Sequence, residues 1–269
     1  SEDLLPSLFH ARDRFLAPGG QLIPDRARML VCPVSVPAYY AKHIDIWSDP
    51  EAKPLASGDL GLDFAGARAY AANALFCDSR KQFDPVELAA PAELLGMDFH
   101  RATDAGCDVA QVVSVARAGT CHGWLGWFDM RLGEEWLSTS GDPEETHWSP
   151  AFMPLAKPLE LSPGDALGFA LKRPQFGEWT WTTEHAGSRQ LQSTFLSRPQ
   201  TPANLLRASG DYRPELDARG RVAGWVLTEM RGRSSVNELA ESLLERFPGE
   251  FHGEAEALAF VRELAEAYS

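Results

Sequence analysis

The pattern of the chain changes once, near residue 200, and this change limits the folds that the sequence can adopt. Before it, short stretches of β-branched, aromatic and other apolar residues are separated by glycine and proline turns. Such spacing is typical of antiparallel sandwiches and barrels. The clearest strands are predicted at residues 28–34, 109–116, 120–132, 167–172, 179–184 and 190–196. Residues 21–200 therefore predict a mainly β domain.

After residue 211, apolar residues recur at helical spacing instead. One stripe precedes Phe247, and Ser234 or Ser235 can cap that helix, with Glu238 placed for a capping box. Its apolar positions are Val236, Leu239, Ala240, Leu243, Leu244 and Phe247. A second stripe contains Ala257, Leu258, Val261, Leu264 and Ala265. We therefore place a domain boundary at 200–210 and expect a small helical domain over residues 201–269.

Two parts of the first 200 residues depart from the strand pattern. Residues 4–15 have apolar side chains near helical spacing, and Gly19 and Gly20 follow as a stop signal. Residues 61–95 are rich in alanine, which favours short helices. This second segment predicts a helical insertion in the β domain, and an insertion of that kind needs a surface to pack against.

Charge and cysteine content exclude several classes of function. The chain has 38 acidic and 25 basic residues, a net charge of −13, whereas nucleic-acid binders present basic faces. The acidic excess suits a basic partner, although solubility explains it equally well. No stretch has the apolar length of a membrane span, and no signal peptide is present. The 4 cysteines show no metal-ligand spacing, so we expect reduced thiols in a cytoplasmic protein.

Common site motifs are absent from the sequence. The 7 histidines are not spaced as metal ligands, so we expect no metal site. No glycine-rich turn opens a helix after a strand, and no nucleophile elbow is present. What remains is Thr146, His147 and Trp148, a loop bracketed by acidic residues and proline. A loop histidine beside a carboxylate can orient groups or move protons, whereas Trp124, Trp127 and Phe128 are interpreted as core.

Several segments, in the correct order, resemble the protein arginine methyltransferases. The threonine–histidine–tryptophan loop is similar to that family's loop, and the strand before it reads CHGWLGWFDMRL. The segment LFHARDRFLAPGGQLIPDRARMLVCPV resembles the passage from the family's cofactor domain into its barrel. The region GDLGLDF to FDPVELAAPAELLGMDF matches the place of its helical dimerisation arm. The resemblance covers residues 2–172 and, more weakly, extends to 198.

The resemblance implies a fold and a division of labour. It implies an antiparallel β-barrel over residues 21–200, with a helical dimerisation arm at about 61–95 and a homodimer. Residues 1–20 would be a helix left from a preceding Rossmann-like domain. That missing domain would hold S-adenosylmethionine, since these residues contain no glycine-rich loop of the kind needed. We therefore expect the chain to bind no cofactor and to be inactive alone.

The resemblance also assigns residues and a substrate class. Two glutamates of the family grip a substrate guanidinium, and Glu2 falls where the second would be. Glu2 and His147 are then candidate catalytic residues, and Thr146 and Trp148 are candidate substrate-binding residues. The substrate would be a basic, arginine-containing protein or peptide.

The tail has a second resemblance and leaves an alternative open. Residues from 211 onward are similar to small winged-helix domains of the PqqD type, which bind peptides by adding a strand to an edge. A helical cap that only stabilises the barrel is the other interpretation. For the whole chain, the alternative to part of an enzyme is a non-catalytic peptide-binding or dimerisation module.

Overall fold

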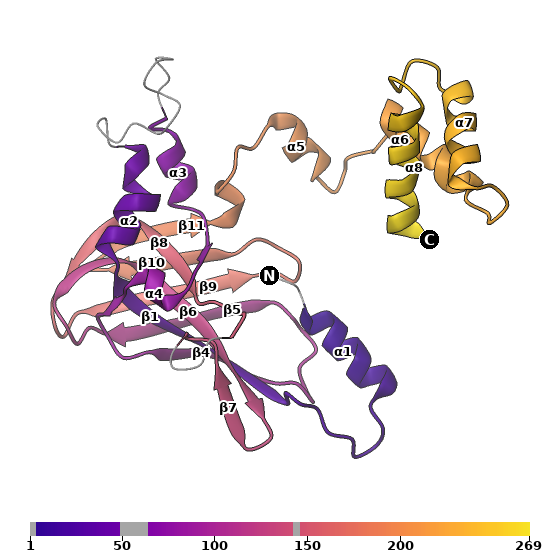
Figure 1. Cartoon of the computed structure of the whole chain (residues 1–269). Coiled ribbons are helices and arrows are strands. Elements are labelled where there is room, and N and C mark those ends of the chain that lie inside the picture. The colour runs from indigo at the N-terminus through magenta and orange to yellow at the C-terminus, as the bar shows by residue number, and fades with distance from the viewer. Residues whose placement is uncertain (1–3, 49–63, 142–145) are drawn as a thin grey trace. The chain divides into compact units, whose positions relative to one another are not determined.

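The computed structural model describes residues 4–48, 64–141 and 146–269. The chain divides into two compact units, residues 1–200 and 201–269 (Figure 1). All of the strands belong to the first unit, which we call the sheet unit. The regular elements of the second, the helical unit, are all helices. The model is thus of mixed α and β type with antiparallel sheets.

The larger sheet of the sheet unit is built around β1 (Arg26–Ser35) and β6 (Gly119–Leu132), which pair along almost the whole of β1. On the far side of β6 come β8 and then β2, while β3 and β4 pair with successive parts of β1, and β7 pairs with the end of β6. The bounds of these strands are Phe76–Cys77 for β2, Val86–Glu87 for β3, Ala92–Asp98 for β4, Glu135–Ser138 for β7 and Ala151–Leu161 for β8.

The smaller sheet has the order β11, β10, β9, β5. Its strands are β5 (Cys107–Ser114), β9 (Ala166–Arg173), β10 (Thr180–His185) and β11 (Ser188–Ser193). Within the described residues no ladder joins the two sheets, so the expected closed barrel is not found. Side chains connect them instead: the Gln190 amide accepts from the Lys157 N–H at 2.9 Å and donates to its carbonyl at 2.8 Å.

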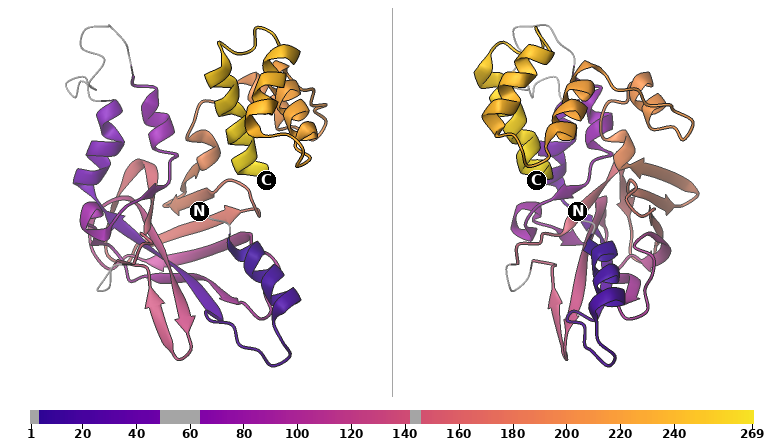
Figure 2. Two further views of the ribbon diagram at one scale, coloured as in Figure 1. Left: turned by 45° about the vertical axis from the view of Figure 1, so that its right-hand side comes forward. Right: turned by 90° about the vertical axis from the view of Figure 1, so that its right-hand side faces the viewer.

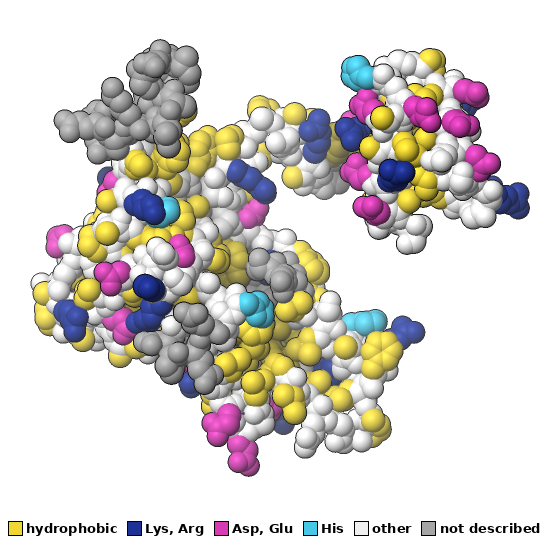
Figure 3. All heavy atoms as spheres, viewed as in Figure 1, with side chains coloured by type: hydrophobic (Ala, Val, Ile, Leu, Met, Phe, Trp, Pro, Cys, Tyr) yellow, Lys and Arg dark blue, Asp and Glu magenta, His cyan; other side chains and the backbone are white. Residues whose placement is uncertain are grey.

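The outer face of the larger sheet is covered by helices. Helix α2 (Pro37–His43) leads into a 3-10 turn at Asp45–Trp47, and α3 (Ala67–Ala71) lies beside it (Figure 2). The Arg68 guanidinium joins them by donating to Asp45 at 3.0 Å. The Tyr40 hydroxyl donates to the Leu155 carbonyl on β8 at 2.7 Å, which fixes α2 to the sheet. Around the base of these helices hydrophobic side chains also reach the surface (Figure 3).

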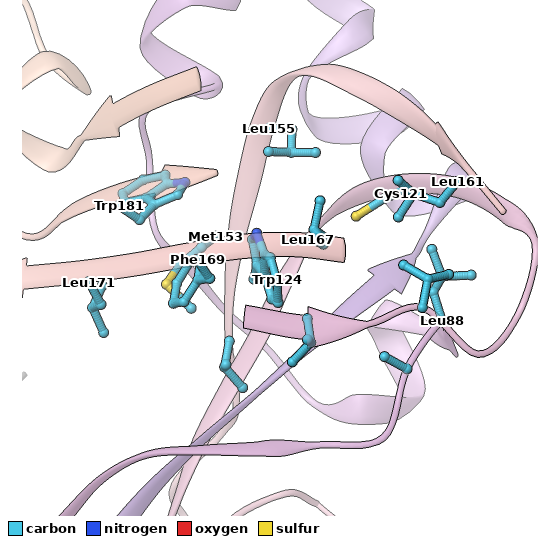
Figure 4. Close-up of a cluster of buried hydrophobic side chains, with 14 residues drawn as sticks. Leu88, Cys121, Trp124, Met153, Leu155, Leu161, Leu167, Phe169, Leu171 and Trp181 are labelled. Atoms are coloured by element: carbon cyan, nitrogen blue, oxygen red, sulfur yellow. The ribbon is translucent and has the colours of Figure 1, made fainter. Parts of the chain in front are cut away.

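The main core lies between the two sheets (Figure 4). Trp124 and Trp181 are fully buried there, and Trp124 lies 4.5 Å from the Phe169 ring. A buried indole N–H needs an acceptor, and both have one. Trp124 donates to the Thr183 hydroxyl and Trp181 to the Pro154 carbonyl, each at 2.9 Å. The interpretation of Trp124 and Trp127 as core residues is confirmed.

Because both faces of the larger sheet are covered, its central strands are buried on both sides. Every residue from 121 to 125 on β6 is buried. Trp124 packs in the core between the sheets, whereas Leu125 packs with Tyr39, Tyr40 and Phe83 under the helices. This two-sided burial explains why β6 reads as a nearly continuous apolar run instead of an alternating one.

The expectation of short helices over residues 61–95 is wrong for its second half. The described helices of this segment are α3 and α4 (Arg80–Phe83), whereas residues 92–95 belong to strand β4. Leu94 packs against the main core. Alanine, glutamate and leucine favour helices intrinsically, but pairing with β1 overrides that weak preference. Residues 61–63 lie outside the described residues.

The first helix, α1 (Leu4–Phe15), has the bounds expected from the sequence. Its Arg12 guanidinium donates to the carbonyls of Phe99 at 2.8 Å and Ala102 at 2.6 Å. These bonds tie α1 to the turn after β4. None of the described helices is long and apolar enough to cross a membrane.

The helical unit contains α5 (Pro202–Arg207), α6 (Ala218–Glu229), α7 (Val236–Arg246) and α8 (Glu254–Tyr268). Ser235 and Glu238 form the predicted capping box at the start of α7. Val226, Leu243 and Val261 are fully buried where α6, α7 and α8 meet. Residues 201–269 are all described and contain no strand. The strand edge expected of a winged-helix unit is therefore missing.

Candidate functional site

The loop that carries Thr146, His147 and Trp148 joins β7 to β8, and its first residues are fixed to β6. Thr139, which is buried, donates from its N–H and its hydroxyl to the Phe128 carbonyl, at 3.0 and 2.8 Å. In return, the Phe128 N–H donates to the Thr139 hydroxyl at 3.2 Å. Residues 142–145 lie outside the described residues.

The second end of the loop is a compact turn organised by Thr146. Its hydroxyl accepts from the Trp148 N–H at 3.2 Å and donates to the Trp148 carbonyl at 3.0 Å. Threonine hydroxyls close turns in this way by bonding to backbone two residues on. The expected role of Thr146 in binding substrate stays a prediction, since the hydroxyl bonds observed are to the turn itself.

The aromatic rings of the loop are stacked onto β6. The Trp148 indole meets the Phe128 ring edge to face, with ring centres 5.7 Å apart, and His147 lies over Trp148 at 4.1 Å. Phe128 therefore anchors both ends of the loop, by its backbone to Thr139 and by its ring to Trp148. Sequence reasoning took Phe128 for general core packing. Its anchoring role depends on the pairing of β6 with β7, which no local motif reveals.

His147 is exposed and Trp148 is half-buried. The arrangement presents an imidazole at the surface with one face against an indole. Such a ring can donate or accept a hydrogen bond, and its partner wall is rigid. The geometry thus suits orientation of a polar ligand beside an aromatic surface.

A buried carboxylate neighbours the loop anchor along β6. Asp129 is 5% exposed, and its Oδ2 accepts from Arg28 Nε at 2.9 Å. The guanidinium of Arg28 lies over the Trp136 ring at 4.7 Å. Among the described residues, Oδ1 of Asp129 has no hydrogen-bond partner. Sequence reasoning missed this group, because a single aspartate in a strand carries no signal of burial.

Glu2, the candidate guanidinium-binding carboxylate, lies outside the described residues, so its place beside His147 stays a prediction. The described part of the chain brings no three His, Cys, Asp or Glu side chains together as metal ligands. It also offers no fit for a nucleotide-type cofactor. All of its ladders are antiparallel, whereas such cofactors bind where a parallel strand turns into a helix.

Residues 25–175, more than half of the chain, match the family model of the arginine methyltransferase oligomerization subdomain. In this chain the matched range contains strands β1 to β9 and the loop that carries Thr146, His147 and Trp148. The chain therefore belongs to the protein arginine methyltransferase family.

The chain is similar to two Xenopus tropicalis proteins over about 60% of its length. It is 27% identical over 173 residues to protein arginine N-methyltransferase 6, covering 60% of this chain and 48% of that protein. It is 26% identical over 178 residues to protein arginine N-methyltransferase 2, covering 62% and 39%. The chain thus spans about half the length, or less, of these relatives.

Two solved structures share the fold. The Trypanosoma brucei PRMT1 enzyme–prozyme heterotetrameric complex with AdoHcy has a TM-score of 0.59 and 21% identity, covering 71% of this chain and 62% of that one. Arabidopsis thaliana protein arginine methyltransferase 10, in an open conformation, has a TM-score of 0.55 and 20% identity, covering 72% and 66%.

Proposed function

We propose that this chain is the substrate-binding and oligomerisation part of a protein arginine methyltransferase-like enzyme. The enzyme would transfer a methyl group from S-adenosylmethionine to an arginine of a basic protein or peptide. S-adenosylmethionine would be held by a Rossmann-like domain outside these residues, because the described residues do not fit it. The observation that carries the proposal is the exposed His147–Trp148 pair, anchored on β6 within the matched subdomain.

The residues of this chain would act by orientation. A carboxylate accepts a guanidinium through a two-pronged, charge-assisted hydrogen bond, which fixes the plane of the group. Glu2 would supply such a carboxylate, and His147 would hold charge beside it. Trp148 would form the wall against which the substrate side chain lies. Most of the catalytic benefit of such a site comes from positioning and charge stabilisation.

The experiment that tests this function uses His147→Ala in the full-length translation product that contains these residues. Methyl transfer to an arginine-rich peptide should fall by about 10² or more, since positioning errors near a reacting group have effects of this size. In the 269-residue chain the same change should alter the free energy of unfolding by no more than about 0.5 kcal/mol, because His147 is exposed.

Ser149→Ala, an exposed position in the same loop, is the matched control and should preserve activity. Loss of activity together with a drop in melting temperature of several degrees would make His147 a structural residue. If the wild-type protein methylated no arginine, the alternative of a non-catalytic peptide-binding or dimerisation module would be favoured.

We further propose that the chain forms a homodimer through the surface at α2 and α3. Tyr70 on α3 is 40% exposed and would be covered in such an interface. Within the segment expected to form the dimerisation arm, Leu75, Phe76 and Leu94 pack against the chain's own cores. Light scattering at tens of micromolar should give twice the monomer mass for the wild type. Tyr70→Glu should reduce the measured mass to that of the monomer.

A further inference from the structure

The helical unit carries a surface pocket that the proposed methyl transfer does not use. It lies between α6, α8 and the segment that joins α7 to α8, and its volume is about 380 Å³. Pockets for small ligands have about 300 to 1,000 Å³. The residues that line it are Arg219, Val222, Glu250, Phe251, Glu256, Ala259, Phe260 and Glu263. All of them lie outside the matched range of 25–175.

The floor of the pocket is aromatic and already holds a guanidinium. The rings of Phe251 and Phe260 are 5.4 Å apart, at an angle of 55°. The guanidinium carbon of Arg219 lies 5.4 Å from the centre of the Phe260 ring, within the range of a cation–π contact. The surface is therefore chemically suited to a flat cation with an aliphatic stem.

The rim of the pocket supplies carboxylates. Glu250, Glu256 and Glu263 are all exposed. Glu256 is engaged by His252, whose backbone N–H and ring Nδ1 lie 2.7 and 2.9 Å from its carboxylate. For Glu250 and Glu263, no side-chain hydrogen bond or ion pair is found within the described residues. On the face shown in Figure 3, the helical unit displays hydrophobic side chains ringed by acidic ones.

We propose that this pocket docks a basic peptide segment through one arginine side chain. The aliphatic stem lies on the half-buried Phe251, beside Arg219, and the guanidinium is accepted by the carboxylates of Glu250 and Glu263. Arginine suits the site better than lysine, because its guanidinium stacks on aromatic rings and bonds carboxylates in a planar fork. The net charge of −13 favours the approach of such a basic segment.

The mode of binding differs from strand addition, which the unit has no strand to support. It also goes beyond the proposed methyl transfer. A docking pocket in the helical unit selects and retains a basic segment whether or not one of its arginines is modified at the His147 loop. The two proposals therefore fail in separate experiments.

The test measures binding to the 269-residue chain by fluorescence anisotropy. The probe is a labelled synthetic peptide that carries a single arginine, compared with the same peptide carrying lysine or citrulline at that position. Citrulline keeps the shape of arginine without its charge. We expect saturable binding of the arginine peptide, weaker binding of the lysine peptide and none of the citrulline peptide.

Two double variants with equal charge separate the pocket from general attraction. Glu250→Gln with Glu263→Gln should weaken binding by about tenfold or more, a change of about 1.4 kcal/mol, because the charge-assisted hydrogen bonds to the guanidinium are lost. Glu241→Gln with Glu245→Gln, at exposed positions of α7 away from the pocket, should change it less than about twofold, as expected for distant surface charges. Ala259→Trp, which fills the pocket from an exposed position of α8, should abolish binding while the circular dichroism spectrum is kept.

Equal weakening by both double variants would overturn the proposal in favour of general electrostatic attraction. Equal affinity for the citrulline peptide would overturn it in favour of a purely apolar contact. Absence of any binding by the folded wild-type chain would also end it. None of these results bears on the His147→Ala methylation assay, which reports on the other site.

Discussion

The two units of this chain differ in the sequence separation of the contacts that define their elements. In the sheet unit, Arg28 on β1 faces Asp129 on β6, a separation of 101 residues, and the whole β1–β6 ladder has similar spans. In the helical unit, the defining contact at the start of α7 joins Ser235 to Glu238, three residues apart. The first kind of structure depends on pairing across the chain, and the second depends on signals that can be read locally.

The units also differ in how much core supports them. The sheet unit has two buried clusters, one on each face of its larger sheet. The helical unit has a single cluster formed by three helices. Small units bury a smaller fraction of their surface and are correspondingly marginal in stability. A single core residue should therefore matter more for the folded population of the helical unit.

The largest effect is expected from Leu243→Ala, at the fully buried centre of the helical cluster. Leucine-to-alanine changes in cores cost about 2–5 kcal/mol. A loss of that size should unfold the helical unit and leave the sheet unit folded. Urea unfolding followed by far-ultraviolet circular dichroism should lose its helix-rich transition while near-ultraviolet signals from the buried Trp124 and Trp181 remain.

Leu227→Ala, on the same unit but 37% exposed, serves as the matched control and should preserve both transitions. If Leu243→Ala lowered both transitions together, the units would unfold as one, and the contrast between them would not hold.

The next effect is expected in the sheet unit from Gly123→Ala. At this position β6 shifts its register against β8, and an added Cβ would lie 2.4 Å from the Met153 carbonyl oxygen and 2.6 Å from the Phe152 ring. Overpacking of this kind costs about 1–3 kcal/mol, and backbone atoms cannot easily move aside. The urea concentration at the midpoint of the sheet-unit transition should fall accordingly.

Gly210→Ala is its counterpart in the helical unit, since a Cβ there meets nothing within 4 Å. It should change the free energy of unfolding of either unit by no more than about 0.5 kcal/mol. If Gly123→Ala left the stability of the sheet unit unchanged, β8 would be able to move relative to β6, contrary to the close contacts expected at Gly123.

The smallest effect is a pH dependence of the sheet unit between pH 7.5 and 5.5. Burial lowers the pKa of His122, whose Nδ1 accepts from the Val36 N–H at 3.2 Å at the start of α2, although Thr120, Asp45 and Glu160 partly offset the shift. Because the folded-state pKa lies below the unfolded value of about 6.5, the unfolded chain binds the proton first as pH falls. The stability of the sheet unit should therefore decline below about pH 6.5 and be insensitive to this group above it.

Burial also lowers the pKa of His43, which adds a contribution of the same sign. Melting temperatures of the sheet unit between pH 7.5 and 5.5 should thus fall, and His122→Gln should flatten the slope. His100→Gln, at an exposed turn, should leave the slope as it is in the wild type. A slope unaffected by His122→Gln would assign the pH dependence to other groups.

The contrast between local and distant contacts also explains which elements the sequence predicted. The capping box of α7 could be read directly, because Ser235 and Glu238 are three residues apart. Strand β6 could be read from its length and composition. Strand β4 was mistaken for helix, since only its pairing with β1 reveals it. Helix α2 was missed because Pro37 and two tyrosines follow a β-branched strand and resemble its continuation.

The candidate site was predictable in its residue types but not in its support. The sequence indicated Thr146, His147 and Trp148 through a resemblance to a family, and their roles stay a prediction. Phe128 and the buried Asp129 could not be foreseen, because both act through strands that meet only in the folded chain.

The double anchoring of the loop by Phe128 has a consequence for protein engineering. With Thr139 and Trp148 both held on one β6 residue, β6 sets the distance between these two positions. The cost of closing a longer connection grows only slowly with its length, by about 0.6 kcal/mol per doubling. A change in the length of the connection before Thr146 should therefore leave the imidazole of His147 in its position over Trp148.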